Sequence, residues 1–404
     1  MGIPFSWLLS AISASSPLLS IVGNRNSLPQ NVTLGSETQN QFCEYEINGS
    51  GCAMTAIRMR CPNWYVNATS TEVDGSSDLT VSASIEYPIG GTRYQMTIGG
   101  SADLAVPIGT TKTFDPHPTL VLPDGAIYRK WVWVRVAGGG HYPTAARQLL
   151  SALGEGNEVS FGGNLTNKTL SGSITPANGG GYDTVVLGLP VSGTPRTVLI
   201  IGDSIDAGQY ETNSSQYTSD ANGNQGPFER SFGATHGILN IARATTQAAH
   251  WAVANVGTKR LAFMADIALP KVAMGLGRND YGANKTASQI KADVETVLNT
   301  FAPTASTVWV RDLTCTTSSS DGWVTLNNQT RSAGANTTQE TNRVAYNAIV
   351  SASGIARQTN YYALSPTMTT TNATPIVCWP ANWTLDGIHP LAAANAATAA
   401  ANSV

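Results

Sequence analysis

Three segments in the first half of the chain alternate apolar and polar residues. They run from Leu79 to Pro88, from Arg93 to Gly100 and from Lys130 to Val136, and clusters of Gly, Pro, Asn and Asp separate them. Alternation with a period of about two residues puts successive side chains on opposite faces of a strand. We therefore predict that residues 1–190 form an all-β sandwich or jelly-roll-like domain.

The segment from Lys130 to Val136 allows two interpretations of its aromatic side chains. Its valines share one face, while Trp131 and Trp133 share the other face with Arg135. Flat aromatic rings beside a cation are suited to stack on sugar rings. The alternative, which we favour, is that a neighbouring loop or the other domain covers these rings.

A short helix is predicted from Tyr142 to Gly154, with Gly154 at its C-terminal end. The Gly-rich stretch from Pro176 to Gly181 and the segment from Leu189 to Arg196 are typical of a linker between domains.

The second half has a different pattern. Short apolar runs from Val198 to Ile201, from Lys271 to Gly277 and from Ser306 to Leu313 alternate with amphipathic stretches from Thr286 to Phe301 and from Gln339 to Gly354. Continuous apolar strands separated by helices indicate a parallel sheet with helices on both faces. We therefore predict an α/β domain over residues 191–404.

Polar clusters follow these runs or lie near the C-terminus. Ligands of such sheets bind outside the carboxyl ends of the strands, so chemistry is expected in these clusters. They contain Ser204, then Gly257, then Arg278, Asn279 and Asp280, and finally Asp386 and His389.

Three of these residues are the types that serine hydrolysis of an ester requires. Ser204 would be the nucleophile, His389 the base, and Asp386 the carboxylate that orients the imidazole. Each type also has an ordinary explanation. The serine belongs to a turn sequence that is common by chance, and an Asp-x-x-His pair also suits a surface hydrogen bond or half of a metal site, although no other histidine has metal-like spacing.

An ester hydrolase also needs donors for the developing oxyanion. The backbone N–H groups of Ser204 and Gly257 and the side-chain amide of Asn279 are the candidates, although the last two also suit an ordinary bend and turn. Arg278 and Asp280 are candidates for substrate contacts or for a salt bridge between loops. Asp203 we interpret as structural, because Asp side chains accept local backbone hydrogen bonds in turns.

Read in chain order, "GDSI" at Ser204, "NVG" at Gly257, "GRND" at Asn279 and "DGIHP" at His389 resemble the four motifs of the GDSL/SGNH hydrolase superfamily. The resemblance covers the chain from Thr197 onward, with isoleucine where the family name has leucine. It implies a three-layer flavodoxin-like domain that hydrolyses carboxylic esters through an acyl-serine intermediate, with no metal and no organic cofactor. Within that superfamily we expect a carbohydrate O-acetylesterase, because a β-rich domain precedes the hydrolase-like half and no long apolar lid is evident.

The amino-acid composition excludes some classes of binding partner. Charged residues make up 12% of the 404 residues, and the net charge is −3. Such a chain has no basic field to attract nucleic acid or anionic lipid, and no later run approaches the ~18 apolar residues of a membrane span. The expected partner is an acetylated glycan or another small ester.

A second hypothesis is a virion-associated, for example phage, or secreted adhesion protein whose hydrolase-like domain binds glycans without turnover. The Thr-, Asn- and Gly-rich first half suits it. The complete set of Ser, Asp and His favours an enzyme, because simple binding does not require all three. Both hypotheses place the protein outside the cell, and homo-oligomers or virion assembly are compatible with either.

The cysteines and the N-terminus leave alternatives open. Five cysteines form no Cys-x-x-Cys pair; the first three allow one disulfide, and Cys315 with Cys378 allows another. The first residues are apolar but lack the positive region of a good signal peptide, and a myristoylation pattern at Gly2 has no basic patch beside it.

Overall fold

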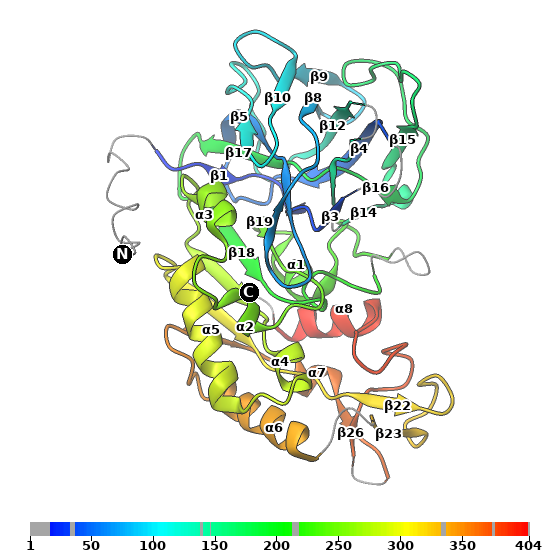
Figure 1. Ribbon diagram of the computed structural model, residues 1–404, viewed down its shortest axis with the longest axis vertical. Coiled ribbons are helices and arrows are strands. Elements are labelled where there is room, and N and C mark those ends of the chain that lie inside the picture. Colours follow the sequence, from blue (N-terminus) through cyan, green and yellow to red (C-terminus); the bar gives the residue numbers. More distant parts are fainter. Residues whose placement is uncertain are drawn as a thin grey trace.

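The computed structural model describes residues 17–32, 37–137, 140–145, 147–211, 218–332, 337–373 and 376–402 (Figure 1). The expectations for a leader or a lipid anchor fall on the first sixteen residues, which lie outside the described residues.

Two antiparallel sheets dominate the first half. Their apolar faces share one core, in which Met59 of one sheet joins Val81 and Val134 of the other. The first sheet has the order β1 (Ser20–Ile21), β17 (Val185–Pro190), β5 (Met54–Pro62) and β11 (Thr111–Thr113). The second has the order β10 (Asp103–Val106), β8 (Leu79–Tyr87), β12 (Ile127–Val136), β4 (Gln39–Ile47) and β15 (Gly156–Ser160), and β9 (Thr92–Gln95) pairs with β8. The three strands predicted from alternation, β8, β9 and β12, are confirmed.

The aromatic face of β12 is not an open platform. Trp131 is 4% exposed, and its indole N–H donates to Glu86 at 2.7 Å. The guanidinium of Arg93 lies 3.5 Å from the centre of its ring, and Arg135 lies 4.1 Å from the centre of Trp133. Arg93 of β9 and Glu86 of β8 contact the buried Trp131 ring, so the sugar-stacking interpretation is wrong for Trp131.

The helix predicted from Tyr142 to Gly154 is also wrong. This stretch instead contributes β13 (Pro143–Thr144), β14 (Gln148–Leu149) and a single 3₁₀ turn at Ser151–Leu153. The backbone N–H of Leu150 donates to the buried Glu155 carboxylate at 2.5 Å, which holds the segment in an extended course. Only the C-terminal glycine behaves as expected, with a φ of 72°.

The second half is built on one parallel sheet. Its order is β2 (Asn26–Ser27), β19 (Gly237–Asn240), β18 (Thr197–Ile201), β20 (Lys271–Met274), β21 (Thr307–Arg311) and β24 (Asn360–Tyr362). Every neighbouring pair is parallel. The five strands of the second half therefore follow the order 2-1-3-4-5 of a flavodoxin-like sheet, the kind of domain that the motif resemblance implies.

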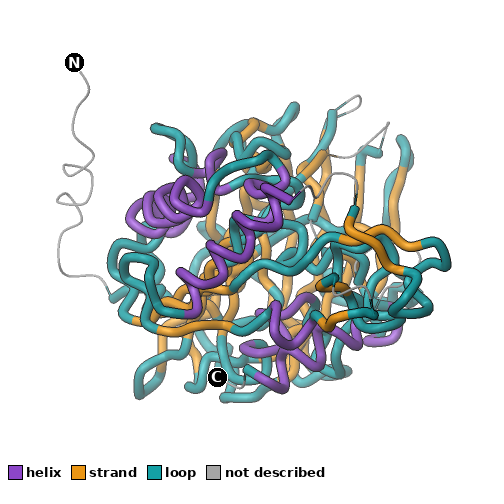
Figure 2. The backbone as a smooth tube through the Cα atoms, turned by 90° about the horizontal axis from the view of Figure 1, so that it is seen from below, coloured by secondary structure: helices purple, strands orange, loops and turns teal. Residues whose placement is uncertain are grey.

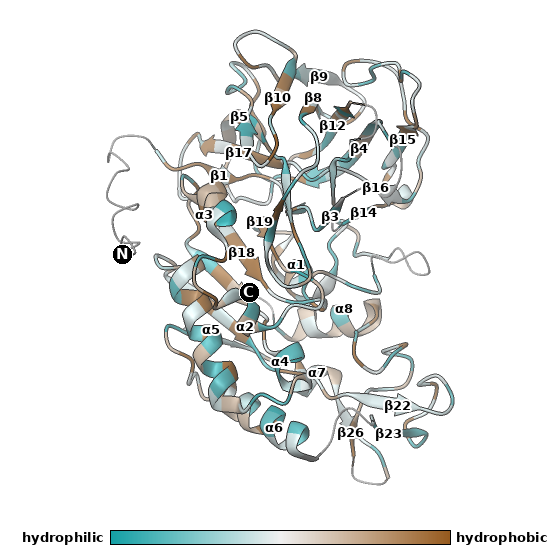
Figure 3. Cartoon of the chain, viewed as in Figure 1, coloured by the Kyte–Doolittle hydropathy of each residue, from teal (hydrophilic) through white to brown (hydrophobic). Residues whose placement is uncertain are grey.

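Helices cover both faces of this sheet (Figure 2). The apolar run of β18, brown in Figure 3, explains why: Val198 and Ile200 pack against Phe228, whereas Leu199 and Ile201 join the core on the opposite face. The first face carries α1 (Gly226–Phe232), α8 (Ala392–Ala401) and the short α7 (Ser365–Met368). The second face carries α2 (Ala248–Trp251), α3 (Thr258–Met264), α4 (Arg278–Gly282), α5 (Ala287–Phe301) and α6 (Thr337–Ser351).

Small two-stranded ladders complete the described fold. They are β6 (Trp64–Val66) with β7 (Glu72–Asp74), β3 (Asn31–Val32) with β13, β14 with β16 (Gly179–Gly180), β22 (Thr317–Ser319) with β23 (Gln329–Arg331), and β25 (Thr370–Thr371) with β26 (Val377–Cys378).

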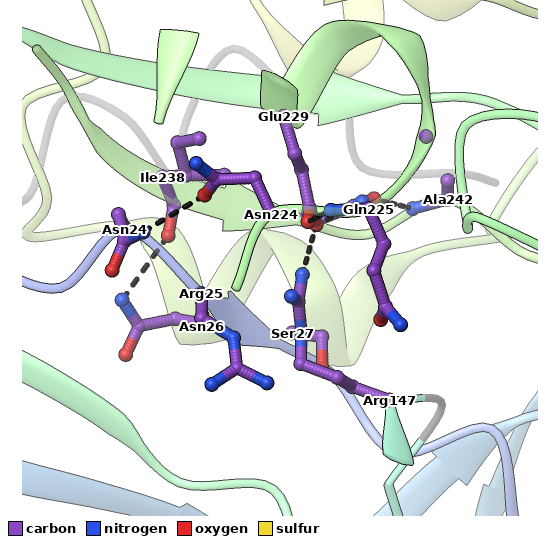
Figure 4. Close-up of polar contacts among 12 residues, drawn as sticks. Asn24, Arg25, Asn26, Ser27, Arg147, Asn224, Gln225, Glu229, Ile238 and Ala242 are labelled. Carbon is purple, nitrogen blue, oxygen red and sulfur yellow. Dashed lines mark hydrogen bonds and ion pairs between the residues drawn. The ribbon is translucent and has the colours of Figure 1, made fainter. Parts of the chain in front are cut away.

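The two halves are joined through buried polar contacts as well as apolar ones. Asn24 donates to the side chain of Asn224 at 2.8 Å, and Asn26 donates to the carbonyl of Ile238 at 3.2 Å (Figure 4). Strand β2, which lies in the chain between β1 of the first antiparallel sheet and β4 of the second, belongs to the parallel sheet. The division expected at residue 190 stays a prediction, and the N-terminal segment contributes to both halves.

All five cysteines are buried and free, so neither disulfide that the spacing allowed is formed. Among the described residues, no helix has the length and apolar character needed to cross a membrane.

Candidate active site

Ser204 lies directly beyond the carboxyl end of β18. The neighbours of this strand are β19 and β20, so the strand order reverses here. In parallel sheets, ligands bind in the crevice outside the strand ends at such a switch point. Backbone hydrogen bonds close the turn, from Ala207 N–H to the Asp203 carbonyl at 3.0 Å and from Gln209 N–H to the Ser204 carbonyl at 2.9 Å. The serine is therefore presented on a fixed turn where the topology expects a ligand.

The carboxylates on either side of Ser204 converge on the guanidinium of Arg311. Asp203 accepts from Arg311 Nη2 at 2.9 Å and from the backbone N–H of Ile205 at 3.0 Å, which confirms its predicted role as a turn residue. Asp206 accepts from Arg311 Nε and Nη2, each at 2.9 Å. All three ion-paired side chains are 0% exposed. Arg311, the last residue of β21, thereby ties the turn to the strand that lies beyond β20 in the sheet.

The charges of this cluster do not balance, because two carboxylates share one guanidinium. Burial raises the pKa of Asp206, the Arg311 charge opposes this, and the Asp203 charge adds to it, so that the pKa lies above its usual range. Burial lowers the pKa of Arg311, but the two carboxylates outweigh burial and raise it. Space is also limited, since a Cβ on Gly202 would overlap the Asp206 carboxylate. The turn therefore depends on the positive charge of Arg311 and on a glycine at position 202.

The C-terminal loop brings His389 to Ser204. The imidazole Nε2 lies 2.7 Å from Ser204 Oγ, and Nδ1 lies 2.6 Å from Asp386 Oδ2. The second carboxylate oxygen of Asp386 accepts the backbone N–H groups of Ile388 and His389, each at 2.9 Å. The spacing of three residues places the carboxylate and the imidazole on one tight loop, as expected.

The ionisation of Asp386 fixes the tautomer of its partner. Burial raises the pKa of Asp386, but the hydrogen bond from His389, the charge of that imidazole and the two backbone N–H groups outweigh burial and lower the pKa to about 2. A carboxylate accepts hydrogen bonds only, so Nδ1 carries the proton toward Asp386. Neutral His389 then presents an unprotonated Nε2 that accepts the Ser204 hydroxyl proton.

Asn279 lies in the first turn of α4, beyond the end of β20. Its side-chain amide donates to the carbonyl of Thr246 at 2.9 Å. Thr246 belongs to the loop after β19, and the backbone N–H of Arg243 in that loop donates to the carbonyl of Gly202 at 3.0 Å. The loop thus links Asn279 to the nucleophile turn. A primary amide has two hydrogens, and the bond to Thr246 uses one of them.

The structure does not bring Gly257 to this site. It precedes α3, and a Cβ there would overlap the ring of Phe301 at the C-terminal end of α5. That end of α5 leads into the start of β21, at the edge of the sheet opposite Ser204. The backbone φ of Gly257 is 86°, a conformation that glycine adopts without strain, and this explains why a glycine occupies the position. The expected oxyanion contact from Gly257 is therefore wrong, because this glycine serves a helix start.

Arg278 and Asp280 also have structural partners. Asp280 is 0% exposed and accepts the backbone N–H groups of Ala248 at 2.7 Å and Ala249 at 3.2 Å, at the start of α2. Arg278 is 5% exposed and donates to the Thr316 hydroxyl at 2.6 Å. The substrate contacts expected of these two residues are not supported. Asp280 instead forms an ion pair with Lys285 at 3.8 Å, in the loop between α4 and α5.

One aromatic residue at the site has no motif in the sequence. The ring of Tyr210 stacks on the His389 imidazole, with the ring centres 5.2 Å apart and the planes at 28°. The only sequence signal for a role of Tyr210 at the site is its position six residues after Ser204. Among the described residues, no group of three or more His, Cys, Asp or Glu side chains is arranged to hold a metal ion.

Comparison with known proteins returns solved structures only. No family model and no curated protein matches the chain. A GDSL-like lipase from Bacteroides thetaiotaomicron is 14% identical with a TM-score of 0.33, covering 51% of this chain and 84% of that one. A family two carbohydrate esterase from Cellvibrio japonicus is 12% identical with a TM-score of 0.33, covering 97% and 95%. An acetyl-xylooligosaccharide esterase from Geobacillus is 14% identical with a TM-score of 0.34, covering 51% and 91%.

These solved structures are of the classes that the sequence motifs resemble, GDSL-like lipases and carbohydrate esterases. Their identities of 12–14% are too low to transfer an activity. The chemistry proposed below therefore rests on the geometry of the site.

Replacing the buried guanidinium tests the cluster beneath Ser204. Arg311→Met leaves two buried carboxylates without a counterion, and we expect a loss of about 3–5 kcal/mol in the free energy of unfolding, measured by urea denaturation. Lys291→Met, which breaks a partly exposed ion pair with Glu295, should cost about 0.3–0.5 kcal/mol. Equal losses in the two variants would show that the Arg311 cluster does not hold the fold.

The placement of Gly257 is tested by a matched pair of glycines. Gly257 and Gly100 have φ values of 86° and 84°, but space is open around a Cβ only at Gly100. Gly100→Ala should cost about 1–2 kcal/mol through backbone strain alone. Gly257→Ala should cost about 1–3 kcal/mol more, because the methyl group overlaps Phe301. Equal losses in the free energy of unfolding, measured by urea denaturation, would show that the Phe301 ring does not lie against Gly257.

Proposed function

We propose that this protein is a serine esterase that hydrolyses carboxylic esters through an acyl-serine intermediate. The observation that carries the proposal is the continuous hydrogen-bonded chain from Ser204 Oγ through His389 to Asp386, with contacts of 2.7 and 2.6 Å. It lies at the switch point of the parallel sheet, where ligands of such folds bind. A nucleophile, a base and an orienting carboxylate in this order are the parts that acyl transfer requires.

In the proposed acylation, Ser204 Oγ attacks the ester carbonyl carbon while its proton passes to His389 Nε2. The resulting imidazolium is stabilised by the ionised Asp386. When the tetrahedral intermediate collapses, the bond to the alcohol oxygen breaks and Nε2 returns its proton to that oxygen. The alcohol leaves, and the acyl group stays on Ser204.

Deacylation repeats these steps with water. His389 takes a proton from the water as its oxygen attacks the acyl carbon, and then returns a proton to Ser204 Oγ as the acid is released. The oxyanion of each intermediate needs donors, and we propose the second amide hydrogen of Asn279 and the backbone N–H of Ser204. We assign no other residue to the third oxyanion donor, the role that was expected of Gly257.

For the substrate we propose an O-acetyl group on a carbohydrate. Ser204 is 5% and His389 9% exposed, which favours a small acyl group over a bulky one. The half-buried ring of Trp323 supports a sugar-facing surface nearby, since a Cβ on Gly387, two residues before His389, would lie 3.0 Å from its Cζ2. We further propose the two-sheet first half as an accessory β-sandwich domain. Extracellular location and virion or oligomeric assembly stay predictions.

Removing the nucleophile tests the proposal. Ser204→Ala should lower the kcat for p-nitrophenyl acetate by roughly 10⁴-fold or more, because the remaining groups offer no replacement nucleophile. Acetate release from acetylated polysaccharides should fall in parallel. Ser306→Ala, at an exposed serine before β21, is the control and should match the wild type. Undiminished hydrolysis by Ser204→Ala would refute the mechanism, and glycan binding without hydrolysis by the wild type would favour the adhesion hypothesis.

The pH dependence follows from the two ionisable partners. The pKa of Asp386 is lowered to about 2, so this carboxylate stays ionised throughout the range from pH 5 to pH 9. Protonation of His389 removes the base, so kcat/KM should fall about tenfold per pH unit on the acidic side of a single titration. A pH profile of p-nitrophenyl acetate hydrolysis measures this. A flat profile between pH 5 and pH 8 would contradict the role of the imidazole.

A further inference from the structure

Tyr210 contacts both partners of the nucleophile. Its ring stacks on the His389 imidazole with the ring centres 5.2 Å apart, and its hydroxyl lies close enough to the Asp386 carboxylate for that charge to act on the phenol. Burial raises the pKa of Tyr210, and the nearby Asp386 charge adds to this effect, so the phenol stays protonated. The groups that face His389 are thus Ser204 on one ring nitrogen, Asp386 on the other, and Tyr210 on the ring face.

The backbone at Tyr210 is strained and fixed. Its φ is 73°, a conformation that costs free energy for any residue other than glycine. Hydrogen bonds on both sides enforce it, from Gln209 N–H to the Ser204 carbonyl and from Glu211 N–H to the Gly208 carbonyl, each at 2.9 Å. Strain of this kind persists only where the surroundings impose it, and it concentrates at functional sites.

The next residue anchors the turn to the rest of the domain. Glu211 is 0% exposed and accepts from the backbone N–H of Gly226 at 2.6 Å and from Asn395 at 2.8 Å, and it pairs with Arg230. These contacts join the turn to α1 and α8. The ring of Tyr210 is therefore held over the imidazole by a rigid backbone.

We propose that Tyr210 is a positioning residue of the triad, which fixes the plane of the His389 ring by stacking and shares the Asp386 carboxylate through its hydroxyl. This proposal rests on the proposed esterase function. The hydroxyl draws part of the carboxylate charge away from the imidazole.

Two variants and a control separate the contribution of the Tyr210 ring from that of its hydroxyl. Tyr210→Phe keeps the stack and removes the hydroxyl beside Asp386, so the acidic limb of kcat/KM for p-nitrophenyl acetate should move up by about half a pH unit with kcat on the plateau little changed. Tyr210→Ala loses both and should also lower the plateau kcat by about tenfold with little change in KM. Tyr361→Phe, which removes a 2.7 Å bond from a tyrosine to Asp312 outside the site, should leave the profile unchanged.

A second readout does not depend on turnover. Titration of the His389 imidazole signals by NMR, assigned with His389→Gln, should show a midpoint that rises in Tyr210→Phe and not in Tyr361→Phe. Unchanged midpoints and profiles in Tyr210→Phe, together with an unchanged plateau in Tyr210→Ala, would overturn the proposal while leaving the triad intact. Absence of Ser204-dependent hydrolysis in the wild type would instead refute the esterase function, and the NMR midpoint would still decide the role of Tyr210.

Discussion

The buried ion pairs of Arg311 with Asp203 and Asp206 are the interaction on which the site depends. They connect the turn after β18 to the end of β21 across the intervening strand β20. Two carboxylates packed beside the nucleophile would repel each other without the guanidinium between them. Because the serine sits between these two aspartates in the chain, its position is set by their contacts rather than by contacts of its own small side chain.

The first half of the chain also supports the site. Gln30 donates to the carbonyl of Ala242, and Arg243 in the same loop donates to the carbonyl of Val66 at 2.9 Å and to Gln30 at 3.2 Å. This is the loop after β19 that accepts the amide of Asn279. The β-rich half therefore holds one wall of the site in place, in addition to whatever surface it offers to a partner.

The sequence predicts the parts of the site that are local in the chain. Asp386 and His389 form one loop, and Ser204 ends an apolar strand, so a short stretch determines each. Gly257 shows the limit of prediction from sequence. A glycine indicates an unusual backbone conformation, but it does not indicate at which edge of the sheet the residue lies. Arg311 and Tyr210 act through contacts made only after folding, although an arginine inside an apolar strand is a sign of a buried ion pair. The helix predicted after Tyr142 is absent because Glu155, paired with Arg25 and the Tyr45 backbone, also accepts from Leu150 N–H, and these contacts override the local pattern.

The central claim is that His389 activates Ser204 as a nucleophile, and covalent labelling tests it most directly. A fluorophosphonate, which phosphonylates activated serines with loss of fluoride, would be reacted with the full chain, and the labelled peptide identified by mass spectrometry. We expect one adduct, on Ser204, and its loss in His389→Gln with the fold intact by circular dichroism. Labelling of Ser204 at the same rate in His389→Gln, or no labelling of Ser204 in the wild type, would contradict the account.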